Sequence, residues 1–324
     1  MKTKVAMLLC LLCWIWAFGS LAADKIIRVG LIGLDTSHAP AFTKLLNDTT
    51  GADPVPGARV VCAFPGGSDD LEASYSRVER FTAQIRDQYH VEIVPDIPSL
   101  LPKVDAVILT SVDGRVHLEQ VKPVIQAKKP VFIDKPMAAS LEDVRKIFEL
   151  ARRYKVPCFS ASSLRYFDEL QAAMKDTSLG NIVGCVAYGP SSLEPHHPDL
   201  FWYGIHAVEI LFTVMGPGCR TVQRTYSEGT DIVTGLWADG RIGTFRGIRS
   251  GKSGFGALIF SDNKIALVEP GQGSAYRNLL QQVITFFETG LPPVSEEETL
   301  AIFEFMDAAD QSKHADGAPI KILR

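Results

Sequence analysis

Short apolar runs alternate with amphipathic stretches through the first 160 residues, and this alternation restricts the fold more than any other feature of the chain. Runs typical of buried strands occupy 25–32, 58–64, 91–94, 106–110, 130–133 and 156–160. Segments with helical spacing lie at 38–46, 72–89, 117–127 and 141–154. Such spacing predicts a parallel, doubly wound sheet with helices on both faces. Its ligands are expected outside the carboxyl ends of the strands.

The pattern changes after about residue 160. Helical spacing returns at 170–173 and 201–215, and residues 221–269 are then mostly strand-like, with a hairpin signal at Asp239-Gly240. Two closing helices are expected at 276–289 and 296–312. We therefore expect a Rossmann-like α/β domain at 24–160, followed at 161–324 by an α+β domain with an open, mostly antiparallel sheet.

The first 23 residues have the features of an export signal. Lys2 and Lys4 supply positive charge, residues 5–18 are apolar, and small residues allow cleavage after Ala22 or Ala23. Because no twin arginine is present, we expect Sec-type export to the periplasm or the extracellular space, with no stable membrane insertion after cleavage. The alternative is an uncleaved anchor, for which the apolar run is only just long enough.

Charge and metal-ligand spacing exclude two classes of function. The 324 residues carry a formal net charge of -4 and contain no run rich in Lys or Arg, so binding to nucleic acid is not expected. His196, His197, Asp199 and His206 are residue types that bind zinc. Adjacent histidines do not readily both point inward, so no metal site is expected.

Several segments, in their order and spacing, resemble the Gfo/Idh/MocA family of sugar oxidoreductases. They are the opening strand that ends at Gly33, the segment 105–136 that ends in Asp-Lys-Pro, the helix 202–216, and the two closing helices. The resemblance covers essentially the whole mature chain. It implies a nicotinamide cofactor, NAD(P), on the first domain and a small carbohydrate or polyol between that domain and the open sheet. The exposed face of the sheet often forms dimers in such folds, so the resemblance also allows a homo-oligomer.

Lys135 and His206 are the main catalytic candidates. Lys135 follows a buried strand and precedes a proline, so it is held at the carboxyl edge of the sheet, where it can polarise a carbonyl or hydroxyl. His206 and Glu209 lie at i and i+3, so the carboxylate can orient the imidazole. The family's aspartate four residues before the histidine is Trp202 here. We expect Lys135 and His206 to share one site with Glu209; the alternatives are a surface lysine and a histidine buried by helix packing.

The glycine-rich turn departs from the family's pattern Gly-x-Gly-x-x-Gly. Only its first glycine, Gly33, is kept. Asp35 replaces the glycine that lets the pyrophosphate approach, and His38 replaces the third. We expect both side chains to face the cleft and to obstruct the pyrophosphate. The residues that the resemblance places at the dinucleotide are Gly33, Asp35, Ser37, His38, Thr110 and His117.

Three functions remain open on these residues. The first is a sugar or polyol oxidoreductase with an atypical dinucleotide site. The second is a cofactor-independent glycoside hydrolase or lyase that uses the same cleft for acid/base chemistry, and the third is a non-catalytic carbohydrate-binding protein. Retention of both Lys135 and His206 favours an enzyme.

Overall fold

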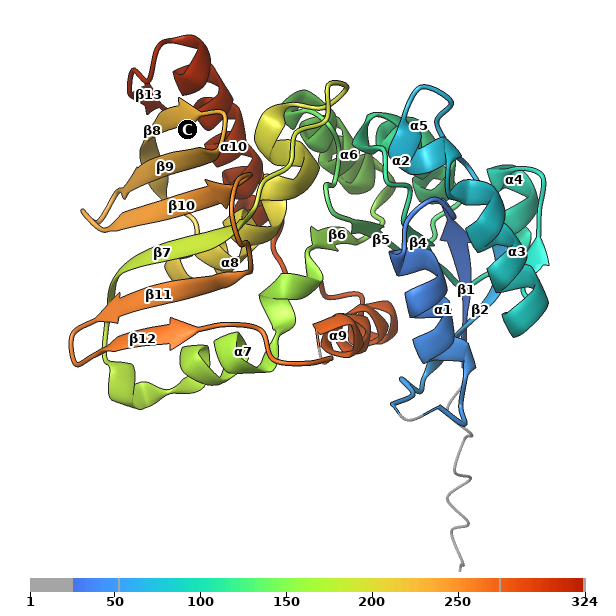
Figure 1. Cartoon of the computed structure of the whole chain (residues 1–324). Coiled ribbons are helices and arrows are strands. Elements are labelled where there is room, and N and C mark those ends of the chain that lie inside the picture. The colour runs from blue at the N-terminus through green and yellow to red at the C-terminus, as the bar shows by residue number, and fades with distance from the viewer. Residues whose placement is uncertain (1–25, 52, 274, 323–324) are drawn as a thin grey trace, which may run out of the picture.

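The structure, a computed structural model, describes residues 26–51, 53–273 and 275–322. The expected export signal at 1–23 lies outside these ranges. Two β-sheets stand side by side, with helices around the first sheet and between the two (Figure 1). No helix within the described ranges is long and apolar enough to cross a membrane.

The first sheet has six parallel strands in the order β3-β2-β1-β4-β5-β6. The strands are β1 (Ile27–Ile32), β2 (Ala58–Phe64), β3 (Glu92–Ile93), β4 (Ala106–Leu109), β5 (Val131–Asp134) and β6 (Cys158–Ala161). The chain fills the sheet outward from β1 in one direction and then, starting with β4, in the other. Doubly wound sheets bind ligands at this switch point. The predicted Rossmann-like sheet is therefore confirmed.

The helices around this sheet largely follow the predicted segments. They are α1 (His38–Asn47), α2 (Glu72–Tyr75), α3 (Val78–Tyr89), α4 (Ile97–Leu100), α5 (His117–Gln126) and α6 (Leu141–Tyr154). The single helix expected at 72–89 is wrong, because the chain breaks between α2 and α3. The Ser76 hydroxyl donates to the carbonyl of Glu72, a local bond that competes with helical bonding, and Arg77 departs from helical geometry with φ of -124°.

The second sheet has seven strands in the order β12-β11-β7-β10-β9-β8-β13. They are β7 (Ile182–Pro190), β8 (Cys219–Ser227), β9 (Thr230–Trp237), β10 (Ile242–Ile248), β11 (Gly256–Ser261), β12 (Ile265–Val268) and β13 (Ile320–Lys321). Only β7 and β10 pair in parallel, so the predicted, mostly antiparallel sheet is confirmed. The sequence did not predict β7, because Gly184 and Gly189 interrupt its apolar pattern. A Cβ at Gly189 would lie 2.7 Å from the Phe255 ring.

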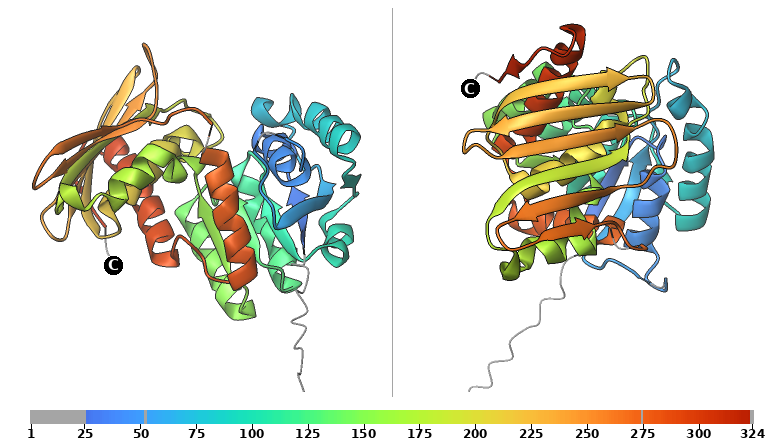
Figure 2. Two further views of the ribbon diagram at one scale, coloured as in Figure 1. Left: turned by 90° about the horizontal axis from the view of Figure 1, so that it is seen from below. Right: turned by 60° about the vertical axis from the view of Figure 1, so that its left-hand side comes forward.

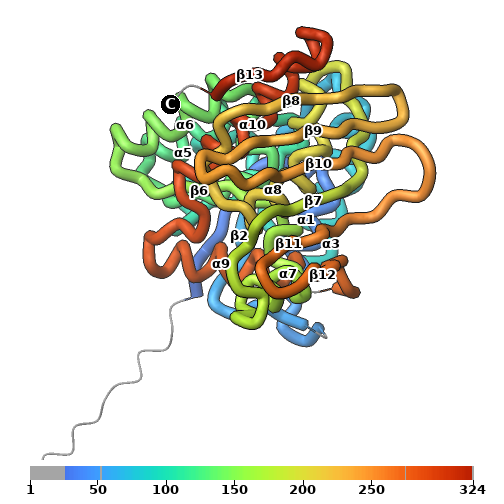
Figure 3. Tube along the Cα trace, turned by 90° about the vertical axis from the view of Figure 1, so that its left-hand side faces the viewer, coloured from blue at the N-terminus to red at the C-terminus, as the bar shows by residue number. Residues whose placement is uncertain are grey.

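Helices cover the second sheet on its inner face. A π-helical turn, Leu200–Gly204, leads into α8 (Ile205–Met215), and α10 (Glu296–His314) runs beside it. Almost every residue of α8 is buried, because the helix lies between the two sheets. The outer face of the sheet is left uncovered by helices of the described chain (Figures 2 and 3). The short α7 (Asp168–Lys175) lies at the β12 edge.

One helix of the C-terminal half packs on the first sheet. The apolar side chains of α9 (Ala275–Thr289), among them Leu279 and Val283, share a core cluster with Val29 of β1 and Phe132 of β5. Figure 2 shows α9 against this sheet, away from the second one. Its first turn brings Tyr276 within ring contact of His38 at the switch point.

Gly33 allows the ends of β1 and β4 to meet. Its φ is +88°, and a Cβ there would lie 2.2 Å from the backbone nitrogen of Ser111. The Thr110 hydroxyl donates to the Gly33 carbonyl at 2.6 Å across the same contact. The first glycine of the turn is thus required by close approach of backbone.

We predict that Gly33→Ala lowers the free energy of unfolding more than Gly240→Ala does. Both glycines have φ of +88°, so both variants carry the same backbone cost, about 1–2 kcal/mol. No atom lies within 4 Å of a Cβ at Gly240, whereas Ser111 blocks one at Gly33. Urea unfolding should show a further loss of at least about 2 kcal/mol for Gly33→Ala. Equal losses would contradict the close approach.

Candidate active site

A cavity of about 520 Å³ lies between the switch point of the first sheet and the helix α8 of the second. The turn after β1, the α2–α3 break, the end of β5, the start of α8 and the segment that leads into α9 all contribute to its wall. Lys135 and His206 both line it, so the structure brings these two candidates together as predicted. Their catalytic roles remain predictions.

Lys135 is half-buried at the end of β5. Loss of hydration lowers the pKa of its ammonium below the ordinary value, and the positive charge of Arg77 adds to this. The carboxylate of Asp134 acts in the opposite direction. A lysine with a lowered pKa gives up its proton more readily than one in water, as acid/base chemistry requires.

His206 is 7% exposed, and its ring faces both the cavity and a serine. Its Nδ1 lies 2.6 Å from the Ser162 hydroxyl oxygen, which in turn accepts the Leu164 backbone N–H at 3.2 Å. The serine proton is thus available to Nδ1, and we infer that Nε2 carries the imidazole proton. Burial, followed by the charges of Lys135 and His38, places the pKa of His206 well below its usual range, so the ring is neutral.

Glu209 is buried behind His206 and does not orient it directly, contrary to expectation. Its carboxylate accepts from Arg165 Nε at 2.8 Å and from the Ser162 backbone N–H at 3.2 Å. The buried guanidinium takes the carboxylate because neither charge has water to solvate it. Glu209 therefore positions Ser162, which contacts His206, and is not among the residues that line the cavity.

A second histidine lines the cavity at the start of α1. His38 Nδ1 lies 2.6 Å from Asp134 Oδ2, and its ring packs against Phe42 and Tyr276. Burial alone would raise the pKa of Asp134, but the neighbouring His38 and Lys135 bring it below its ordinary value. His38 thus faces the cleft as predicted, as a partner of the carboxylate that precedes Lys135.

Asp35 does not face the cleft, and that expectation is corrected. Its carboxylate is fully buried, where it accepts the Val112 backbone N–H at 2.9 Å and the Ser74 hydroxyl at 2.7 Å. Burial raises its pKa, while these two bonds favour its charged form. The side chain turns inward because the Val112 N–H and the Ser74 hydroxyl replace the hydrogen bonds that water would otherwise donate to the carboxylate.

Of the other residues expected at the dinucleotide, one lines the cavity and two are buried away from it. Ser37 lines the cavity. Thr110 is buried and uses its hydroxyl on the turn after β1. The ring of His117 is buried between two backbone carbonyls, those of Ser111 at 2.8 Å and Met137 at 3.2 Å. Thr110 and His117 therefore hold the strand ends and do not reach the cavity.

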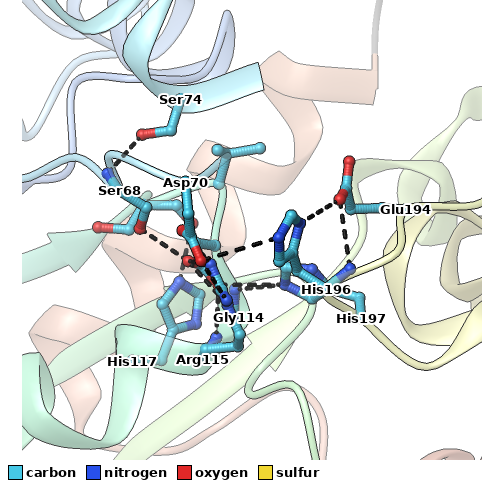
Figure 4. Close-up of polar contacts among 12 residues, drawn as sticks. Ser68, Asp70, Ser74, Gly114, Arg115, His117, Glu194, His196 and His197 are labelled. Atoms are coloured by element: carbon cyan, nitrogen blue, oxygen red, sulfur yellow. Dashed lines mark hydrogen bonds and ion pairs between the residues drawn. The ribbon is translucent and has the colours of Figure 1, made fainter. Parts of the chain in front are cut away.

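The loops that flank the usual dinucleotide slot are tied together (Figure 4). The Ser68 hydroxyl, after β2, donates to Asp113, after β4, at 2.7 Å. Arg115 donates to both carboxylate oxygens of Asp70 at 2.6 and 2.9 Å. Burial alone would raise the pKa of Asp113, but hydrogen bonds with His197, Arg115 and Ser68 hold it well below its usual range.

The residues of this slot do not fit a dinucleotide in its usual place. In doubly wound folds the pyrophosphate binds backbone N–H groups of the turn after β1. Here the Leu34 N–H is bonded to the carbonyl of Pro65 at 2.7 Å, and the Asp35 carboxylate occupies the gap between the turn and Val112. A dinucleotide can therefore enter only if the loops after β2 and β4 separate.

The histidine pair before α8 has separate partners. His196 contacts Glu194 at 2.7 Å, whereas His197 accepts the Gly114 backbone N–H at 3.1 Å (Figure 4), and its ring packs at a tilt against Trp202. Across the described ranges, no group of three or more His, Cys, Asp or Glu side chains is arranged to hold a metal ion.

Sequence reasoning missed three residues at this site. Arg77 was expected inside a continuous helix, Ser162 was not singled out, and Tyr276 was expected only as the start of a closing helix. None had a sequence signal, because their positions depend on a helix break, a strand end and a distant helix that packs back onto the first sheet.

Comparison with known proteins relates the first domain to a family of oxidoreductases. Residues 27–162 match the Gfo/Idh/MocA model, described as an oxidoreductase family with an NAD-binding Rossmann fold. Inositol 2-dehydrogenase of Acidothermus cellulolyticus is 27% identical over 51% of this chain and 44% of its own length. The enzyme of that name from Klebsiella pneumoniae is 28% identical over 68% and 63%. The matches thus span less than two thirds of these relatives.

Solved structures share the fold over most of the chain. Myo-inositol dehydrogenase from Lactobacillus casei, in complex with NAD(H) and myo-inositol, has a TM-score of 0.74 at 18% identity and covers 93% of this chain and 98% of its own. A probable dehydrogenase from Thermotoga maritima has a TM-score of 0.71 at 20% identity and covers 91% and 99%. The first domain thus matches the Gfo/Idh/MocA family model, and the chain shares the fold of these solved dehydrogenases over most of its length.

Proposed function

We propose that this protein is an oxidoreductase that acts on a sugar or polyol in the cavity between the two sheets. The observation that carries the proposal is the convergence of Lys135 and His206, from β5 and α8, on the wall of one cavity. Relatives named inositol 2-dehydrogenase, and a structural neighbour solved with myo-inositol, support a polyol as the substrate.

The chain's own residues account for the proton that such a reaction moves. Oxidation of a secondary alcohol removes one proton from the hydroxyl and one hydride from its carbon. The Lys135 amine, with its lowered pKa, is suited to accept the hydroxyl proton. The Nε2–H of neutral His206 is suited to donate a hydrogen bond to the same oxygen. Glu209 and Ser162 keep the ring in that orientation.

The remaining wall suits a carbohydrate. Trp202, Tyr203 and Tyr276 line the cavity beside polar groups of Ser37 and Ser163. Aromatic faces pack against the apolar face of a sugar or cyclitol ring, while hydroxyl groups of the protein can replace water on its polar edge. No observation favours glycoside cleavage over this reaction.

Replacing Lys135 by Met or His206 by Asn should lower kcat/KM by on the order of 10²-fold or more, because each removes a group that handles the substrate proton. The assay is NADH formation from a panel of polyols that includes myo-inositol, at millimolar NAD⁺. Lys122→Met and His90→Asn are matched controls, since both residues are exposed and outside the cavity. Variants as active as the wild type would reject the proposed pair.

We propose NAD(P) as the cofactor, bound when the loops after β2 and β4 separate. Replacing Ser68 and Asp70 by Ala removes both ties between these loops and should tighten NAD⁺ binding by at least about 5-fold, because the competent state becomes more populated. Calorimetry measures it. Asp69→Ala is the control, because this exposed neighbour has the same charge as Asp70 and no bond to the other loop. Tight binding by the wild type that the double variant leaves unchanged would show that the slot is already open.

A further inference from the structure

The charged groups on the cavity wall are all basic. Arg77 and Lys135 are the fixed cations, His38 and His206 are the titratable rings, and no Asp or Glu is among the lining residues of the described chain. Two carboxylates that adjoin lining residues in the sequence are turned to other partners: Asp134 to His38, and Asp35 to Val112 and Ser74. A ligand in this cavity therefore meets positive charge without a facing carboxylate.

Arg77 has no carboxylate partner among the described residues, whereas the other buried and half-buried arginines do. It is half-buried at the break between α2 and α3, and its Nε donates to the carbonyl of Ala73. Within the described residues no carboxylate forms an ion pair with its guanidinium. Three other arginines pair with at least two carboxylates each: Arg115 with Asp70 and Asp113, Arg165 with Glu209 and Glu298, and Arg224 with Asp199, Asp231 and Asp310.

An unpaired guanidinium in such a place is unfavourable unless a ligand compensates it. Burial lowers the pKa of Arg77, which reflects the loss of hydration of its charge, and the charge of Asp35 offsets this shift only in part. A carboxylate compensates for the lost hydration by accepting two parallel hydrogen bonds from the guanidinium, whose planar shape matches this geometry. The positive charges of Arg77 and Lys135 also repel each other. An anion bound near both would therefore offset this repulsion as well as the lost hydration of Arg77.

We infer that the substrate of this cavity is a sugar acid, whose carboxylate binds Arg77 while one of its hydroxyl groups lies at Lys135 and His206. The inference rests on the proposed function, because it takes the cavity to be a carbohydrate site. A cavity of about 520 Å³ has the size of a small-molecule site and accommodates a single sugar ring. A phosphate group would satisfy the same guanidinium, and the experiment separates the two sources.

The test is calorimetry on the full mature protein with pairs of ligands that differ in one carboxylate. The pairs are glucuronate with glucose, galacturonate with galactose, and gluconate with glucitol, and ADP serves as the phosphate probe. We expect the acid of at least one pair to bind at least about 10-fold more tightly than its neutral partner, since charge-assisted bidentate bonds are among the strong ones. Arg77→Gln should bring that ratio close to one.

Arg80→Gln is the matched control, because Arg80 is exposed, lies in the first turn of α3 three residues after Arg77, and is absent from the cavity wall. It should keep the preference of the wild type. Since Arg77 has no ion pair to lose and only its bond to the Ala73 carbonyl, Arg77→Gln should melt close to the wild type, which separates lost binding from lost folding.

Absence of a carboxylate preference in every pair, including absence of binding, would overturn the inference. So would an Arg77-dependent affinity for ADP without one for any sugar acid, which would assign the guanidinium to a phosphate. The proposed function can fail separately from this inference. If a sugar acid binds through Arg77 but is never oxidised, the inference stands and the proposed function fails. If neutral polyols are oxidised and acids are not preferred, the proposed function stands and the inference fails.

Discussion

The carboxylate of Asp35 connects the three segments that meet at the switch point. It lies in the turn after β1 and accepts the Val112 N–H after β4 and the Ser74 hydroxyl of α2. In a doubly wound fold this is where the backbone would present N–H groups to a phosphate. Here an anion that belongs to the chain occupies that position. Buried N–H and hydroxyl groups need a partner, so a carboxylate within the fold lets this crevice close without a ligand.

The rest of the site follows from that closure. Once Asp35 and Asp134 are bonded inward, the surface left to the cavity carries Lys135, Arg77 and two histidines. Desolvated cations near one another are unfavourable, and this is the physical reason for the lowered pKa values of Lys135 and His206. This arrangement underlies both proposals, the proton transfer at Lys135 and the anionic ligand at Arg77. Shifted pKa values caused by burial and by neighbouring like charges are common at functional sites of proteins.

Local patterns in the sequence predicted the frame of the site. The buried runs fixed the strands of the first sheet, and Lys135 was placed correctly because it follows such a run. His206 was found because the spacing of a helix resembles a family pattern. The direction of the side chains could not be predicted. Asp35 and Glu209 both turned toward partners from distant segments, and the pairing of His38 with Asp134 joins residues whose proximity only the sheet order creates.

The central claim is that Lys135 and His206 act on one substrate in this cavity. A crystal structure of the protein with its tightest-binding sugar or polyol tests it most directly. The account predicts one hydroxyl oxygen of the ligand within hydrogen-bond distance, about 2.7–3.2 Å, of both Lys135 Nζ and His206 Nε2. A ligand bound elsewhere, or one that contacts neither side chain, would contradict it.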